Sequence, residues 1–80
     1  MRVHFYGRLA DAFGTETEVE ISEPCSIAQV RERLAIKYPR DAELLGNRRV
    51  RACVDDSIVP DGHLVRPDES IDFIPPVSGG

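Results

Sequence analysis

The sequence lacks the residue spacings on which familiar catalytic and metal sites depend. Its two cysteines, Cys25 and Cys53, lie far apart and match no metal or redox motif with each other or with His4 and His63. There is no GxxxxGK[ST] phosphate loop and no dinucleotide-binding fingerprint. We therefore expect no bound metal, no bound cofactor and no independent enzymatic activity.

The remaining reactive side chains also have structural interpretations. Cys25 precedes a predicted helix, whose dipole could lower the pKa of its thiol, but no base stands in recognisable relation to it. We expect both cysteines to be structural and reduced. The carboxylates between Asp55 and Glu69 fall among Pro, Gly and Ser, which is typical of turns rather than of a catalytic pair.

Long apolar runs and excess positive charge are absent as well. No run approaches the roughly 18 residues of a membrane-spanning helix, and no signal peptide is recognisable, so a cytoplasmic protein is expected. The net charge is −4, from 14 acidic and 10 basic residues, which argues against nucleic acid or an anionic membrane as partner. Arg48, Arg49 and Arg51 form an isolated basic cluster that we expect to be a solvated strand edge.

What the sequence does contain is one domain's worth of alternating strands around one helix. Strands are predicted at Val3–Tyr6, Glu16–Ile21, Arg49–Val54 and Ser70–Ile74, with a shorter one beginning at Ile58. The stretch "GRLADAFGT" is a connection with one possible helical turn. Leu44, Leu45 and Gly46 are assigned to a polar loop, and "PDGHLVRPDES" to loop and turn.

The helix is predicted between Ser26 and Pro39. Ser26 and Gln29 form a capping-box pattern, and Pro39 ends the segment. Apolar residues recur at helical spacing on one side, namely Ile27, Val30, Leu34 and Tyr38. Charged residues are expected to face water, namely Arg31, Glu32, Arg33 and Lys37.

This order predicts an α+β domain, a mixed sheet of four to five strands packed on one main helix. The predicted core comprises Val3, Phe5, Val19, Ile21, Ile27, Val30, Leu34, Val50, Ala52, Val54, Ile71 and Phe73. Strand alternation places Tyr6 and Ile74 on the other face, beside His4 and Cys53. If the first and last strands pair, Tyr6 and Ile74 form an apolar patch suited to a partner.

The segment "FIPPVSGG" is the most unusual part of the sequence. Pro75 and Pro76 cannot continue a central strand, so we divide the chain into a domain of residues 1–74 and an extended tail of residues 75–80. Such a tail reaches roughly 20 Å. Gly79 and Gly80 lack a β-carbon, so they fit a narrow tunnel and leave the Gly80 carbonyl carbon open to attack.

At this point the chain resembles the small subunit of molybdopterin synthase, the MoaD branch of the ubiquitin-like sulfur carriers. The residues that carry the resemblance are "VHFYGRLADAFG", "SIAQVRERL", "ACVDDSIV" and "FIPPVSGG". The resemblance implies a β-grasp fold. Two departures concern turns: "RPDES" lacks the family's Gly-Asp turn, and Asp55 stands where Asn is frequent.

The resemblance also implies a function. An ATP-dependent adenylating enzyme would activate the Gly80 carboxylate, a persulfide sulfurtransferase would supply sulfur, and the resulting thiocarboxylate would enter the large subunit of molybdopterin synthase. There, two sulfur transfers to a pterin precursor would build the dithiolene that later holds molybdenum. Gly79 would give access, Pro75, Pro76, Val77 and Ser78 would guide insertion, and Tyr6 and Ile74 would dock the partner.

Three alternatives remain open at the level of sequence. The chain is a sulfur carrier for another pathway (thiazole and thiamine, cysteine or tRNA thiolation), a ubiquitin-like protein modifier joined to lysines through Gly80, or an interaction domain with an inert tail.

Overall fold

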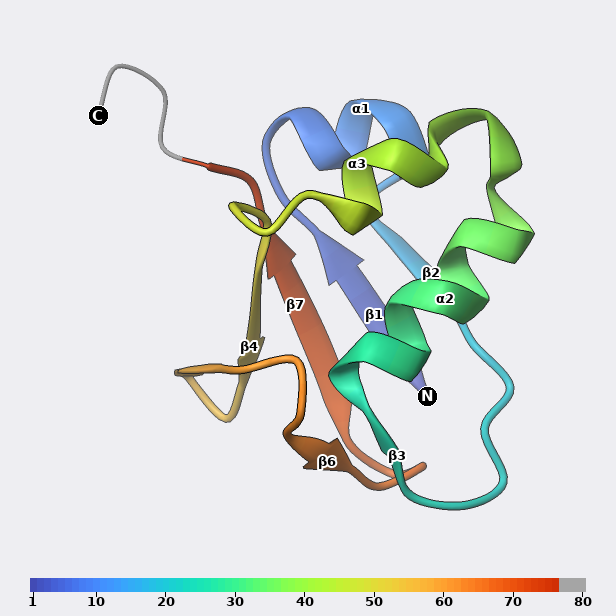
Figure 1. Cartoon of the computed structure of the whole chain (residues 1–80), viewed down its shortest axis with the longest axis vertical. Coiled ribbons are helices and arrows are strands. Elements are labelled where there is room, and N and C mark those ends of the chain that lie inside the picture. The colour runs from blue at the N-terminus through green and yellow to red at the C-terminus, as the bar shows by residue number, and fades with distance from the viewer. Residues whose placement is uncertain (77–80) are drawn as a thin grey trace.

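The structure, a computed structural model, describes residues 1–76 and is built on one five-stranded sheet in the order β2-β1-β7-β4-β5 (Figure 1). The strands of this sheet are β1 (Arg2–Phe5), β2 (Glu16–Glu18), β4 (Arg51–Val54), β5 (Ser57–Val59) and β7 (Ser70–Ile74). The helical segments are α1 (Arg8–Phe13), α2 (Ile27–Lys37), a 3-10 turn (Pro39–Asp41) and α3 (Ala42–Gly46). A separate two-stranded ribbon joins β3 (Cys25–Ser26) to β6 (Leu64–Val65).

The sheet is mixed, as predicted. β1 pairs parallel with β7, whereas the pairs β1–β2, β4–β7 and β4–β5 are antiparallel. The first and last strands are therefore neighbours, with Val3 opposite Ile71 and Phe5 opposite Phe73. Because they run in the same direction, both end at the same edge of the sheet, beside α1.

Helix α2 begins and ends where the sequence predicts. Ser26 Oγ accepts the backbone N–H of Gln29 at 3.2 Å, and Gln29 Oε1 accepts the N–H of Ser26 at 2.8 Å, which completes the capping box. The next two N–H groups, of Ile27 and Ala28, donate to the carbonyls of His63 and Asp61. The helix start is thus fixed by its own cap and by the loop before β6.

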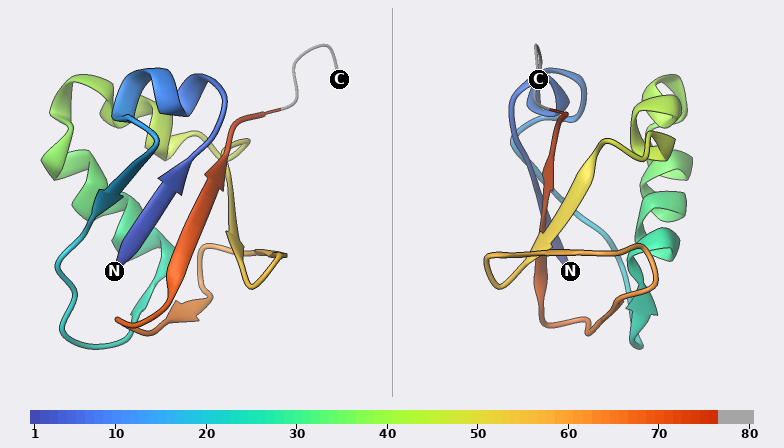
Figure 2. Two further views of the ribbon diagram at one scale, coloured as in Figure 1. Left: turned by 180° about the vertical axis from the view of Figure 1, so that it is seen from behind. Right: turned by 60° about the vertical axis from the view of Figure 1, so that its left-hand side comes forward.

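Helices α2 and α3 lie on one side of the sheet and close the core (Figure 2). Every predicted core residue is buried except Ile21, which is partly buried and packs against the core from the segment after β2; the strand itself ends at Glu18, three residues earlier than predicted. The core also includes buried residues that the sequence analysis did not assign to it: Leu9, Phe13, Cys25, Leu45 and Val65.

Two segments assigned to loops are regular structure, so those predictions were wrong. Val65 is fully buried and pairs with Cys25 between β6 and β3, and Leu45 is buried on α3. Strands of two residues are too short to show alternation, and a five-residue helix is too short to show a period. Tertiary packing, rather than local pattern, forms these elements.

Arg31 is a further correction, because it does not face water. Its side chain is only 11% exposed and donates hydrogen bonds to the carbonyls of Leu45, at 2.8 Å, and of Val50. It also pairs with Asp61 at 3.0 Å and lies 5.2 Å above the ring centre of Phe73. One guanidinium therefore ties α2 to α3, to the segment before β4 and to the loop before β6.

The two turns that depart from the family pattern are closed by ordinary contacts. Asp55 and Asp56 have φ values of 52° and 64° and connect β4 to β5 as a two-residue hairpin, a conformation that Asp tolerates better than most residues. The turn before β7 is held by Glu69, whose carboxylate accepts the N–H of Arg66 at 2.8 Å and whose N–H donates to the Arg66 carbonyl at 3.0 Å.

Candidate functional site

The candidate site lies at the edge where β1 and β7 end. The predicted strand includes Tyr6, but β1 ends at Phe5, so Tyr6 is the first residue after the strand. The Tyr6 N–H still donates to the Phe73 carbonyl at 3.3 Å, which keeps Tyr6 beside the last residues of β7. Its side chain is 50% exposed, while Ile74 and Pro75 are half-buried. Tyr6, Ile74, Pro75 and Pro76 are therefore gathered at one end of the sheet.

A contact missed by the sequence analysis lies at the same place. Gly7, with φ of 55°, packs directly against Pro75, and a β-carbon built on Gly7 would lie 2.9 Å from Pro75 Cγ. In the sequence, Gly7 is only the first residue of the connection "GRLADAFGT". The Gly-then-helix pattern does not reveal which distant residue approaches it.

The face of the sheet opposite α2 is not covered by any helix among residues 1–76 (Figure 2). A row across this face follows from the strand registers and contains Glu16, His4, Asp72, Cys53 and Ile58. His4 lies between two carboxylates, with Nε2 3.5 Å from Glu16 and Nδ1 3.2 Å from Asp72. Ile58 is 60% exposed and adds an apolar side chain to the face that carries Ile74.

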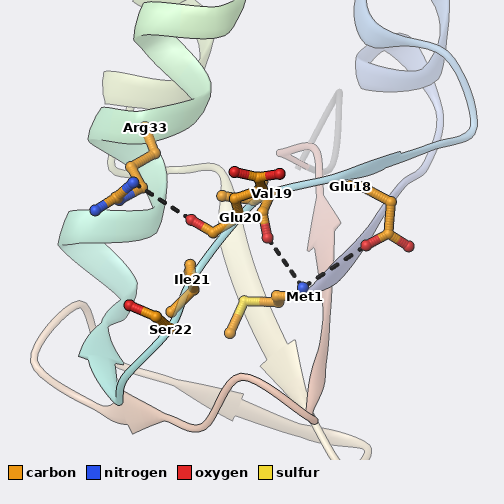
Figure 3. A pocket seen from close by; sticks show the side chains of 7 residues that line it. All are labelled: Met1, Glu18, Val19, Glu20, Ile21, Ser22 and Arg33. Atoms are coloured by element: carbon orange, nitrogen blue, oxygen red, sulfur yellow. Dashed lines mark hydrogen bonds and ion pairs between the residues drawn. The ribbon is translucent and has the colours of Figure 1, made fainter.

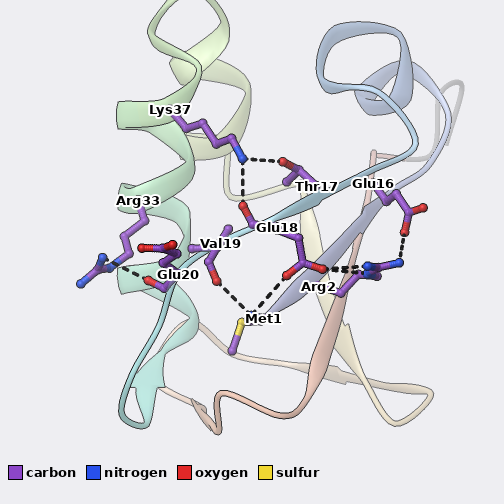
Figure 4. A network of polar contacts seen from close by, with 9 residues as sticks. All are labelled: Met1, Arg2, Glu16, Thr17, Glu18, Val19, Glu20, Arg33 and Lys37. Carbon is purple, nitrogen blue, oxygen red and sulfur yellow. Dashed lines mark hydrogen bonds and ion pairs between the residues drawn. The ribbon is translucent and has the colours of Figure 1, made fainter.

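Toward β2 the same face is charged and its groups are paired (Figure 4). Arg2 donates to Glu18 and to Glu16, each at 3.0 Å. The hydrogen bond from Arg2 holds the pKa of Glu18 below its ordinary value of 4.5. At the margin of β2, Lys37 donates to Thr17 Oγ1 at 2.9 Å and to the Glu18 carbonyl at 2.8 Å.

An open hollow of about 760 Å³ lies at the other end of β1, near Met1 and Ile21 (Figure 3). The Met1 ammonium donates to the Val19 carbonyl at 2.9 Å and lies 3.7 Å from Glu18, and Arg33 donates to the Glu20 carbonyl. The Met1 ammonium and the Arg33 guanidinium therefore already have partners within the chain. The hollow lies at the opposite end of the sheet from Pro75.

Cys25 lies on β3 and Cys53 on β4. Both are free thiols, Cys25 buried and Cys53 half-buried. Burial raises the pKa of the Cys25 thiol against the weaker opposing effect of the Arg33 charge, which favours the neutral thiol over the thiolate. Within residues 1–76 no three His, Cys, Asp or Glu side chains gather closely enough to hold a metal ion.

Val77, Ser78, Gly79 and Gly80 lie outside the described residues. In the part of the chain that the structure describes, no helix has the length and apolar character needed to cross a bilayer.

Comparisons with known proteins agree with the fold and the resemblance. The sequence profile of the ThiS family matches residues 3–80. The molybdopterin synthase sulfur carrier subunit of Escherichia coli (strain K12) is 28% identical over 81 aligned residues, covering 100% of this chain and 99% of that protein.

Solved structures show the same fold at low sequence identity. SAMP1 from Haloferax volcanii superposes with a TM-score of 0.79 at 16% identity, covering 99% of this chain and 97% of that one. A putative molybdopterin converting factor, subunit 1, from Pyrococcus furiosus gives 0.78 at 18% identity, with 95% of each chain covered. The fold is therefore the β-grasp fold, and the chain belongs to the ThiS family of small ubiquitin-like sulfur carriers.

Proposed function

We propose that this protein is the sulfur carrier of molybdopterin synthase and that the carboxylate of Gly80 carries the sulfur. The observation that carries the proposal is the end of β7. There the strand ends at Ile74, on the uncovered face and beside Tyr6. Pro75 and Pro76 follow the strand, and the sequence ends four residues later with two glycines. The name of the Escherichia coli relative supports the molybdopterin pathway.

The chemistry requires activation, because a carboxylate is a poor electrophile. In the proposal, an ATP-dependent enzyme joins the Gly80 carboxylate to AMP and releases diphosphate. A persulfide sulfur then displaces AMP at the carbonyl carbon, and reduction of the resulting acyl disulfide by a thiol leaves the thiocarboxylate. Gly79 and Gly80 suit these successive attacks because neither residue has a side chain that would shield the carbonyl carbon.

In this proposal the folded domain is the part of the chain that binds the partner. Tyr6 and Ile74 would contact the large synthase subunit, and Ile58 extends the apolar part of the same face. The segment of Pro75, Pro76, Val77 and Ser78 would then lead the terminal glycines into the partner's active site. There the thiocarboxylate sulfur would form a bond to a carbon of the pterin precursor, and water would cleave the acyl–sulfur bond, which leaves the sulfur on the pterin and returns Gly80 to a carboxylate. ATP is consumed by the activating enzyme, and we expect the carrier to act in the cytoplasm without a bound cofactor.

The main alternative from a different class is a protein modifier joined to lysines, and SAMP1 is a neighbour in fold. Lys37 is the single lysine of the sequence, and its amine already donates to Thr17 and to the Glu18 carbonyl. A modifier that forms lysine-linked chains of itself would have to use this amine.

Intact-protein mass spectrometry tests the proposal. The chain is incubated with ATP, the adenylating enzyme and a sulfur donor, and the expected product has one oxygen of Gly80 replaced by sulfur. A variant lacking Gly80 is the control and should remain unchanged in mass while unfolding at the same temperature. The large synthase subunit and pterin precursor are then added, and formation of molybdopterin is expected.

The remaining outcomes contradict the proposal in different ways. An unchanged mass would favour the inert interaction domain. A stable adduct on a foreign lysine would favour the modifier. A thiocarboxylate that yields no molybdopterin with the large subunit would indicate a carrier for another sulfur pathway.

A further inference from the structure

Gly7 stands at the junction of β1 and α1 in a backbone conformation that favours glycine. Its φ is 55° and its ψ is −133°, a combination that a residue with a β-carbon adopts only with strain. The conformation is fixed on both sides. The Tyr6 N–H donates to Phe73, the Leu9 N–H donates to the Tyr6 carbonyl at 3.1 Å, and the Ala10 N–H donates to the Gly7 carbonyl at 3.0 Å.

The second constraint on Gly7 is its neighbour across the sheet edge. All three atoms nearest to a β-carbon built on Gly7 belong to the ring of Pro75, and the nearest, Cγ, would be 2.9 Å away. A proline ring can move its Cγ only by a change of pucker, and its φ is fixed, so the ring has little room to yield. A side chain at residue 7 must therefore shift Pro75, residue 7 or both from their present positions.

Pro75 is the first residue after β7, so its position sets the course of the chain beyond the sheet. We propose that Gly7 is a positioning residue, a seat for the Pro75 ring that fixes the direction in which the chain leaves β7. This inference rests on the proposed function, because the segment so directed is the one that carries Gly80. In this proposal Gly7 acts through Pro75.

Gly14 provides a matched control for the backbone effect. It lies at the other end of α1 with φ of 87°, so an alanine there is strained too, but a β-carbon at Gly14 meets none of the described residues within 4 Å. Gly7→Ala and Gly14→Ala should both lower the free energy of unfolding. Only Gly7→Ala should also move Pro75.

The test measures the two glycine variants in the activation and sulfur-transfer reactions. With saturating partner, Gly7→Ala should lower kcat roughly ten-fold or more, because small misplacements of a reacting group cost large factors in rate. The KM that describes binding of Gly7→Ala to the partner should change by less than about two-fold, because the residues proposed to dock the partner, Tyr6 and Ile74, are unchanged. Gly14→Ala should keep kcat within about two-fold of the wild type. Equal losses of kcat in the two variants would overturn the proposal.

A double-mutant cycle supplies a readout that does not depend on activity. Pro75→Ala removes the Cγ atom that the new β-carbon would strike, so Gly7→Ala combined with Pro75→Ala should be less destabilised than the two single effects summed. Additive unfolding free energies would contradict the proposed seat. If the wild type forms no thiocarboxylate, the proposed function fails, while this coupling still decides whether Gly7 positions Pro75.

A second pair covers the case in which Gly7→Ala does not fold. Pro75→Ala and Pro76→Ala loosen the same segment by one proline each, but only Pro75 touches Gly7. Pro75→Ala should lower kcat more than Pro76→Ala does. Equal effects would mean that chain stiffness alone matters and would overturn the assignment of Gly7.

Discussion

The two faces of the sheet differ in what they contribute. The face toward α2 carries apolar side chains that are almost completely buried, such as Val3, Ile71 and Phe73. The other face carries paired charges on β1 and β2, the half-buried Ile74 at the end of β7, and the exposed apolar side chains of Tyr6 and Ile58. Because strand residues alternate between faces, a residue that stabilises the core and a residue proposed to bind the partner are adjacent in one strand.

Phe73 and Ile74 are the sharpest test of this division, and the largest effect is expected at Phe73. Its side chain is 0% exposed and stacks near Phe5, so Phe73→Ala should lower the free energy of unfolding by about 3–5 kcal/mol. That loss is a large share of the roughly 5–15 kcal/mol total of a small domain. Urea unfolding followed by circular dichroism measures it.

Ile74→Ala is the matched variant on the other face. It should cost about 1 kcal/mol of stability, because the side chain is only half-buried, while weakening binding to the large synthase subunit by roughly ten-fold. Calorimetric titration of the partner gives the affinity. If Ile74→Ala destabilised the fold as much as Phe73→Ala, or left binding unchanged, the division between the faces would be wrong.

The polar side chain inserted on the covered side, Arg31, gives the next largest effect. Arg31→Met should lower the free energy of unfolding by about 2–4 kcal/mol, because the carbonyls of Leu45 and Val50 lose their donor. Arg33→Met, on the exposed side of the same helix, should stay within about 0.5 kcal/mol. Equal thermal stabilities of the two variants would show that the buried hydrogen bonds of Arg31 contribute nothing.

The prediction from sequence succeeded where structure follows from neighbouring residues. The capping box of Ser26 and Gln29 located α2, and alternation located the core side chains of β1, β4 and β7. It failed where distant segments decide. Val65 is a strand residue only because Cys25 lies opposite it, and Arg31 is buried only because carbonyls from α3 and the chain before β4 surround it.

At the candidate site, too, features set by neighbouring residues could be predicted, and features set by distant segments could not. Alternation within β7 assigned Ile74 to the outer face, and the parallel pairing of β1 with β7 brought Tyr6 to it. The contact between Gly7 and Pro75 could not be predicted, because it depends on a close approach between residues at opposite ends of the sequence. A glycine is visible in a sequence, whereas the neighbour that requires it is not.

The charged part of the outer face should produce the smallest effect, and one that depends on pH. The hydrogen bond from Arg2 lowers the pKa of Glu18 in the folded chain, so the unfolded chain binds a proton first as the pH falls. This contribution to stability is complete above the ordinary value of 4.5 and is lost as the pH falls through the lowered folded value. Thermal unfolding of the wild type and of Arg2→Gln across this range measures it.

In Arg2→Gln the pKa of Glu18 should return toward its ordinary value, so the stability gap between the two proteins should narrow as the solution is acidified. Added salt at neutral pH should also narrow the gap, because both side chains are more than half exposed and their charges are screened. A gap that stayed constant with pH and salt would mean that Arg2 stabilises the sheet through its aliphatic stem alone. The outer face would then be held, like the covered face, by apolar contact instead of charge.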